Sequence, residues 1–93
     1  MNTAIYKAIV EQRLLTFQYK GKLRRVESHT FGRQVNGKDG VCAWQLSGGS
    51  SEDFHLFFVD EISRLSLVEE SFDGPRPRYR RGDRRFLTIY TEF

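Results

Sequence analysis

Apolar residues recur at helical spacing in the first dozen positions of the chain and at alternate positions after that. The apolar stripe of the first segment consists of Ala4, Ile5, Ala8 and Ile9. Asn2 or Thr3 is suited to cap the first turn, because a short polar side chain there accepts a hydrogen bond from a free backbone N–H. The spacing predicts a short helix over 2–12 with one buried face.

From Leu14 onward the apolar period shortens to two, which is typical of half-buried strands. The predicted strands cover 14–19, 23–33, 41–46, 54–59 and 62–68. The turns predicted between them are Gly21-Lys22, 36–40, 47–53 and Asp60-Glu61. Gly21 suits a tight hairpin because its first central residue needs a positive φ, and Gly32 marks a bend or bulge in the long second strand.

Two of the strands carry predictions about which faces are covered. In 41–46, alternation places Cys42, Trp44 and Leu46 on the core face and Gln45 on the opposite face. The segment 54–59 is nearly all apolar, which predicts a central strand covered on both faces.

One helix followed by five short antiparallel strands predicts a mainly β fold, a small bent barrel behind an N-terminal helix. Closure of the barrel would remove exposed strand edges. The predicted organisation is a barrel domain with its helix over 1–73, followed by an arginine-rich tail over 74–93 that ends in an apolar docking segment.

The tail has two parts with different patterns. Residues 74–85 contain Pro75 and Pro77 among arginines, which predicts an extended segment. Beyond them, the apolar residues Phe86, Ile89, Tyr90 and Phe93 fall at helical spacing. The β-branched residues of this stretch favour a strand instead. We expect a short helix, with Asp83 placed as its cap.

Composition narrows the class of protein. A chain of 93 residues is one domain, and a single Cys excludes an internal disulfide framework. One Cys and two separated His residues predict no metal site, and no motif predicts a cofactor. The sequence has no apolar run of membrane-spanning length and no secretion signal, so we expect a soluble cytoplasmic protein without a membrane partner.

The positive charge is concentrated at the C-terminal end. Lys and Arg number 15 against 12 Asp and Glu, a net charge of +3. Residues 74–93 contain six arginines against Asp83 and Glu92, whereas residues 1–73 are one charge negative. The body is therefore close to neutral, and a nucleic-acid hypothesis based on charge concerns the tail alone.

No catalytic constellation is evident. The chain lacks a glycine-rich phosphate loop and a nucleophile elbow. Cys42, with His29 or His55 as its base, is the one candidate nucleophile. Its place in an alternating strand favours a small buried side chain instead. We therefore predict that the protein is not an enzyme.

An ordered set of short motifs over residues 4–72 resembles the WYL domain family. The motifs are Ala4-Ile5, Phe17-x-Tyr19, Arg25-Val26-Glu27, Ala43-Trp44-Gln45-Leu46, Phe54-His55-x-Phe57-x-Val59-Asp60-x-Ile62 and Phe72. The resemblance implies an Sm-like, SH3-type barrel behind an N-terminal helix. WYL domains usually follow a helix-turn-helix in bacterial transcription regulators, where nucleic acids or nucleotides are leading candidate ligands. Here only a helix precedes the predicted barrel, so we expect a stand-alone module.

The resemblance also implies a ligand-binding set. Carried over by position, it consists of Tyr19, Arg25, His29, Gln45, His55 and Phe57. Gln45 replaces the central Tyr of the family's name triplet, and His55, Phe58 and Glu61 stand where the family favours Arg. These departures weaken an anion-binding pocket, since guanidinium groups are the natural phosphate donors. The alternative is that these are ordinary solvent-side residues, with Arg25 in a cross-strand pair.

The arginine-rich tail is open to two interpretations. Its candidate nucleic-acid-binding residues are Arg76, Arg78, Tyr79, Arg80, Arg81, Arg84 and Arg85. Arginines with an interleaved aromatic suit single-stranded nucleic acid or a nucleotide-like ligand. Equally, the arginines would pin the tail to surface carboxylates. The apolar terminus also permits exchange with a second copy in a homodimer.

The sequence therefore favours a non-enzymatic ligand- or nucleic-acid-binding regulatory module. The alternative is a structural module for protein interaction or homo-oligomerisation, with no nucleic-acid ligand.

Overall fold

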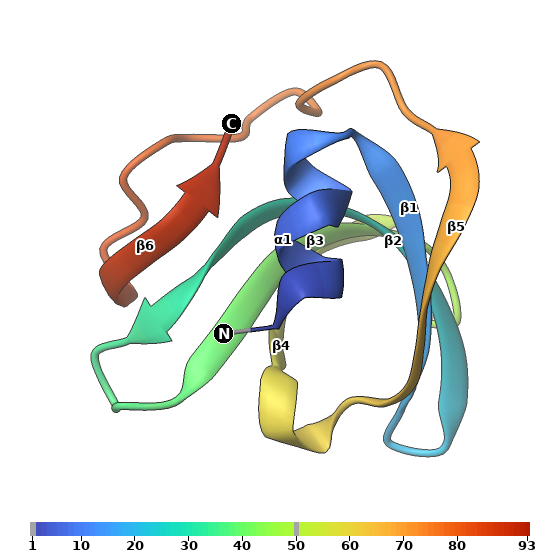
Figure 1. Ribbon diagram of the computed structural model, residues 1–93, viewed down its shortest axis with the longest axis horizontal. Coiled ribbons are helices and arrows are strands. Elements are labelled where there is room, and N and C mark those ends of the chain that lie inside the picture. The colour runs from blue at the N-terminus through green and yellow to red at the C-terminus, as the bar shows by residue number, and fades with distance from the viewer. Residues whose placement is uncertain (1, 50) are drawn as a thin grey trace.

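One helix and six strands make up the fold in the computed structural model, which describes residues 2–49 and 51–93 (Figure 1). In chain order they are α1 (Thr3–Val10), β1 (Arg13–Tyr19), β2 (Lys22–Gln34), β3 (Asp39–Ser47), β4 (Asp53–Phe58), the 3₁₀ turn η1 (Val59–Glu61), β5 (Ser63–Ser71) and β6 (Phe86–Glu92). The mainly β class with an N-terminal helix is confirmed.

The strands form a single antiparallel sheet that is not closed into a barrel. Its order is β4-β3-β2-β1-β5, and β6 pairs with β2 beside this path. Within the described residues, β4 and β5 each pair with one strand only. The predicted closure of the barrel is therefore wrong, whereas the five predicted strands are present and a sixth joins them. The prediction of a central strand over 54–59 is also wrong, because β4 ends the path.

The length of β2 explains the sixth strand. Its first half, Lys22–Val26, pairs with β1, while the stretch from Thr30 to Gln34 pairs with β6 on the edge that β1 has left. A strand with a vacant edge offers backbone partners, and the β-branched residues of 86–93 suit that pairing. The helix predicted for this segment, with Asp83 as its cap, is therefore wrong.

The first hairpin turn lies one residue earlier than predicted. Tyr19 pairs with Lys22, so Lys20 and Gly21 are the two central residues. Both have positive φ, 51° and 77°. This is the backbone that a two-residue hairpin with the right-handed strand twist requires.

The core fills the concave face of the sheet, against which α1 lies (Figure 1). Asn2 caps the helix as predicted, its side chain accepting a hydrogen bond from Ile5 N at 3.1 Å. The buried core residues are Ile5, Ala8, Ile9, Leu15, Phe17, Tyr19, Val26, Phe31, Val41, Ala43 and Phe57. Four of them are aromatic, and the Phe57 ring packs edge-on against Phe17 and Tyr19.

The faces of β3 are the reverse of the prediction. Val41, Ala43 and Gln45 point toward the core and are fully buried. Cys42 and Trp44 lie on the opposite face, where they contact arginines of the C-terminal segment. Because both faces of β3 are covered, alternation alone did not reveal which one meets the core.

Gly32 permits the close approach of β6 to β2. A Cβ built at this position would lie 2.2 Å from the Thr88 carbonyl oxygen. We therefore expect Gly32→Ala to push β6 outward and lower the free energy of unfolding by about 1–3 kcal/mol, the usual range for overpacking.

The matched control is Gly40→Ala in the directly paired residue of β3. A Cβ there meets the flexible end of the Gln34 side chain. Urea denaturation should show a smaller loss for Gly40→Ala than for Gly32→Ala. Equal losses would contradict a specific role of the approach to β6.

Candidate functional site

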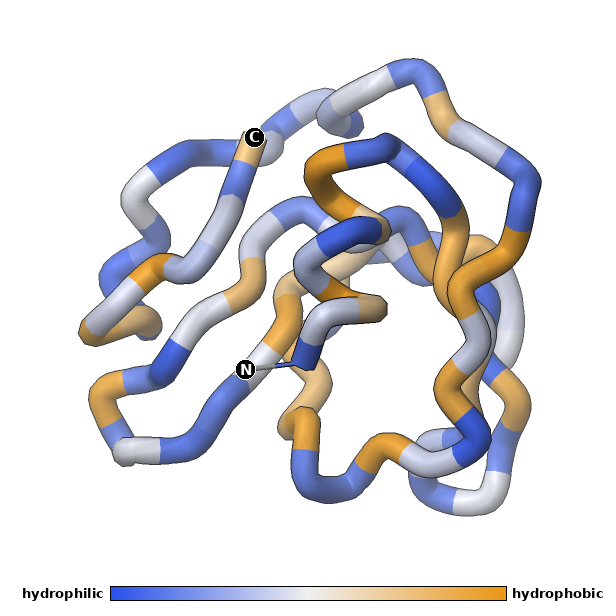
Figure 2. Tube along the Cα trace, viewed as in Figure 1, coloured by the Kyte–Doolittle hydropathy of each residue, from blue (hydrophilic) through white to orange (hydrophobic). Residues whose placement is uncertain are grey.

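The segment between β5 and β6 crosses the outer face of the sheet, opposite the core. We call residues 74–85 the strap. It is largely hydrophilic (Figure 2), yet it contacts β2 and β3 through named side chains. The six arginines of the C-terminal end all lie on this strap, so its anchoring decides which of them remain available to a ligand.

Arg76 is the main anchor. Its Nε and Nη2 donate to Oε1 and Oε2 of Glu27 at 2.7 and 2.9 Å, and the Glu27 side chain is only 7% exposed. Its guanidinium also lies 5.2 Å from the centre of the Trp44 ring. A bidentate pair with a buried carboxylate fixes both distance and orientation. Arg76 therefore acts as a structural clasp.

His29 lies beneath the same point of the strap. A register shift between Ser28 and Thr30 places it at a bulge of β2, and its side chain is fully buried. Nδ1 donates to the Glu27 carbonyl oxygen at 2.8 Å, while Nε2 accepts from the Arg76 backbone N–H at 3.0 Å. Both ring nitrogens are thus engaged in the neutral form. Burial lowers the pKa of His29 and favours that form.

Four aromatic rings surround the imidazole. The rings of Phe54, Tyr79 and Phe93 each lie 5.1 Å from it, and that of Phe72 stacks at 6.0 Å. Phe54 belongs to β4 and Tyr79 to the strap, whereas Phe72 precedes the strap and Phe93 follows β6. The cluster ties the two ends of the C-terminal segment to the centre of the sheet.

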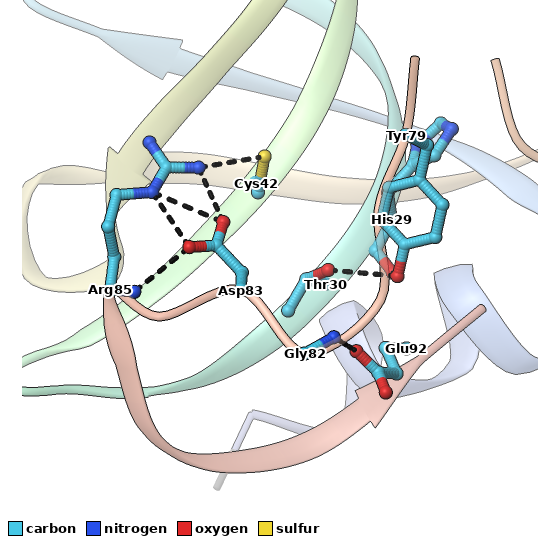
Figure 3. A network of polar contacts seen from close by, with 8 residues as sticks. All are labelled: His29, Thr30, Cys42, Tyr79, Gly82, Asp83, Arg85 and Glu92. Carbon is cyan, nitrogen blue, oxygen red and sulfur yellow. Dashed lines mark hydrogen bonds and ion pairs between the residues drawn. The ribbon is translucent and has the colours of Figure 1, made fainter. Parts of the chain in front are cut away.

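Tyr79 faces inward, in contact with His29 (Figure 3). Its hydroxyl is 3.1 Å from Thr30 Oγ1 and 3.4 Å from the carbonyl oxygens of His29 and Phe93. Burial raises the pKa of this phenol, so it remains protonated. The aromatic that interleaves the arginines therefore serves as a second anchor.

Acidic residues hold two further arginines. Arg85 Nη2 donates to Asp83 Oδ2 at 2.6 Å and lies 3.6 Å from Cys42 Sγ (Figure 3). This hydrogen bond lowers the pKa of Asp83. Arg81 Nε donates to Glu92 at 3.2 Å. These two ion pairs thus hold the second half of the strap in its conformation.

Cys42 lies below this half of the strap. Burial raises the pKa of its thiol. Arg85 Nη2 lies 3.6 Å from its sulfur, and both ring nitrogens of His29 are engaged elsewhere. A buried thiol with a raised pKa yields little thiolate, which is the nucleophilic form.

A groove of about 650 Å³ opens between the strap and the sheet. It is lined by Cys42, Phe54 and residues 78–85. Arg78, Arg80 and Arg84 are exposed there, and among the described residues none of the three has an ion pair or side-chain hydrogen bond. The lining of the groove therefore carries an excess of positive charge, with five arginines against Asp83.

The residues matched to the WYL family by position do not meet on one concave surface. Tyr19, Gln45 and Phe57 are buried around Arg24, a residue that the sequence did not single out. Arg24 donates to Gln45 Oε1 at 2.8 Å and to the Tyr19 carbonyl oxygen at 3.1 Å. Its guanidinium lies 6.0 Å from the Phe57 ring. These groups form a filled polar cluster.

The remaining three members of that set lie apart from the cluster. Arg25 forms an exposed ion pair with Glu70 of β5, a strand separated from β2 by β1. His55 is exposed on β4, and His29 lies under the strap on the other face. The residues that sequence reasoning missed are Arg24, Glu27 and Glu92, because their roles depend on partners far along the chain.

Comparison with protein-family models, curated proteins and solved structures finds no match to this chain. The likeness to WYL domains therefore remains a prediction from its sequence motifs. Within residues 2–49 and 51–93, no helix is both long and apolar enough to cross a membrane, and no three potential metal ligands cluster.

The Arg76 clasp gives a direct test of how the strap is held. We expect Arg76→Ala to leave the Glu27 carboxylate buried without its cation and to destabilise the protein by about 1–3 kcal/mol. Arg76→Lys should recover part of this loss, because Lys keeps the charge but not the two-pronged geometry.

Arg80→Ala is the matched control, since Arg80 is exposed on the same strap. Denaturant unfolding followed by the fluorescence of Trp44 measures all three variants. A loss for Arg80→Ala as large as that for Arg76→Ala would contradict the assignment of Arg76 as the anchor.

Proposed function

We propose that this protein is a non-enzymatic, WYL-like regulatory module that binds single-stranded nucleic acid in the groove under the strap. The observation that carries the proposal is the trio of Arg78, Arg80 and Arg84, exposed on the groove without acidic partners among the described residues. The ligand that matches this trio is one with several phosphates in a row.

The arginines of the strap divide into two groups. Arg76, Arg81 and Arg85 are held by carboxylates and give the strap its shape. Arg78, Arg80 and Arg84 extend from a strap whose backbone is already fixed by these pairs. Phosphate binding therefore needs no rearrangement of the strap backbone. Preorganised guanidinium groups bind phosphate oxygens with two parallel hydrogen bonds.

Phe54 supplies an apolar element of the same groove. It is half-buried between Trp44 and His29 and contributes to the groove lining. Aromatic surface beside a row of cations is the usual means of binding single strands without reading their sequence. Such a site would bind DNA and RNA alike.

The WYL-like assignment rests on the ordered motifs and on the helix followed by antiparallel strands. Because Tyr19, Gln45 and Phe57 are buried with Arg24, the proposed site is on the strap and not at the positions inherited from the family. Because WYL domains usually belong to bacterial transcription regulators, the resemblance adds a regulatory role in a bacterial cytoplasm to this proposal.

Fluorescence anisotropy with short single-stranded DNA and RNA at two salt concentrations tests the proposal. We expect the combined variant Arg78→Gln, Arg80→Gln and Arg84→Gln to weaken binding at low salt. The slope of log affinity against log salt should fall by about 2, as the loss of three phosphate contacts predicts.

The matched control removes the same charge elsewhere through Lys20→Gln, Lys22→Gln and Arg64→Gln, which are exposed and away from the groove. We expect it to keep most of the affinity. Equal weakening by both sets would show that net charge alone drives binding. Absence of binding at low salt would rule out the nucleic-acid function.

The open sheet favours a second candidate function, self-association. Edge strands present unpaired backbone groups that pair readily with another chain. β4 and β5 both end the described strand path. Light scattering should then show a mass of at least twice 10.9 kDa, whereas a monomer over a range of concentrations would exclude this candidate.

A further inference from the structure

We propose that His29 makes the strap acid-sensitive, so that protonation of its imidazole releases the strap from the sheet around Arg76. This is a conformational device in the free protein. Only its consequence for nucleic-acid binding rests on the function proposed above.

The hydrogen-bond geometry at His29 admits one protonation state. Nδ1 carries a proton and donates a hydrogen bond to the Glu27 carbonyl oxygen. Nε2 must be unprotonated, because its lone pair accepts a hydrogen bond from the Arg76 N–H. A second proton on Nε2 would set one N–H against the other at a distance of 3.0 Å. Protonation therefore replaces an attraction with a repulsion and leaves a donor without an acceptor.

The charges around the imidazole offset this change only in part. From β2 the titratable neighbour is Glu27, and from the strap they are Arg76 and Tyr79. The other elements that contact the imidazole present the rings of Phe54, Phe72 and Phe93. The added positive charge lies beside the Arg76 guanidinium. The Glu27 carboxylate favours the added charge, but burial of the imidazole outweighs it, and the pKa of His29 is lowered on balance.

The direction of the pH dependence follows from linkage. Burial, the largest cause, lowers the pKa of His29 below its usual 6.5. The released or unfolded imidazole takes up its proton near that usual value. The strap's attachment through His29 is therefore complete above about pH 6.5 and weakens as the pH falls toward the lowered value. Acid favours the released form.

Release would dismantle the groove, because residues 78–85 form one of its walls. Nucleic-acid binding would then decline in acid. An intact basic groove would behave in the opposite way, since protonation of exposed histidines strengthens phosphate binding. The sign of the pH effect thus separates strap release from simple electrostatics.

Trp44 provides the readout. It is the single tryptophan of the chain, and Arg76 lies over its ring. The fluorescence of the full chain should change between pH 7.5 and pH 5.0 while the far-UV circular dichroism of the sheet persists. One linked proton changes the released population by at most about tenfold per pH unit.

Two histidine variants form the matched pair, because the chain has only His29 and His55. We expect His29→Gln to abolish the pH transition, since glutamine hydrogen-bonds but does not titrate in this range. His55→Gln should keep it, because His55 is exposed on β4. A transition that survives in His29→Gln, or disappears in His55→Gln, would overturn the proposal.

Nuclear magnetic resonance of the unaltered protein decides the matter should His29→Gln fail to fold. The Arg76 amide should lose its protection from exchange at the pH where the His29 ring titrates. An Arg76 amide that stays protected while His29 takes up its proton overturns the proposal, as does the absence of any Trp44 change. None of these measurements needs nucleic acid, so a lack of binding at neutral pH would refute only the proposed function.

Discussion

The outer half of this structure depends on one buried carboxylate. Glu27 lies on the sheet with a side chain only 7% exposed, and a charge removed from water costs several kcal/mol unless it is paired. Its partner, Arg76, comes from 49 residues further along the chain. The pair fixes where the strap crosses the sheet. His29 and Trp44 strengthen that crossing with a third hydrogen bond and a cation–π contact.

The position of the strap then determines how the chain ends. The Arg85 carbonyl oxygen accepts a hydrogen bond from Val35 N at 3.0 Å, just past the end of β2. Phe86 consequently lies opposite Gln34, and β6 runs back along the part of β2 that β1 does not occupy. Gly32 has no side chain to obstruct this approach. The sheet is thereby covered by α1 and the core on one face and by the strap on the other.

What the sequence predicts correctly here depends on near neighbours. The Asn2 cap, the strand over 14–19 and the turn predicted near 36–40, which the structure has at 35–38, involve residues within a few positions of one another. The structure of 86–93 depends instead on the free edge of β2, which lies more than fifty residues away in the sequence. Pairing with that edge outweighs the helical spacing of the apolar residues. The prediction for the two faces of β3 is wrong for the same kind of reason. Arg85 and Arg76, which lie far along the chain, cover Cys42 and Trp44 on the outer face.

The same limit applies to the site. Charge segregation identified every arginine of the strap, but it did not distinguish anchors from available cations. That distinction depends on where Glu27, Asp83 and Glu92 lie in space. A strap that served only to hold β6 in place would need just the arginines that have carboxylate partners. Arg78, Arg80 and Arg84 have no such partners among the described residues, and they are the three arginines on which the proposed nucleic-acid site rests.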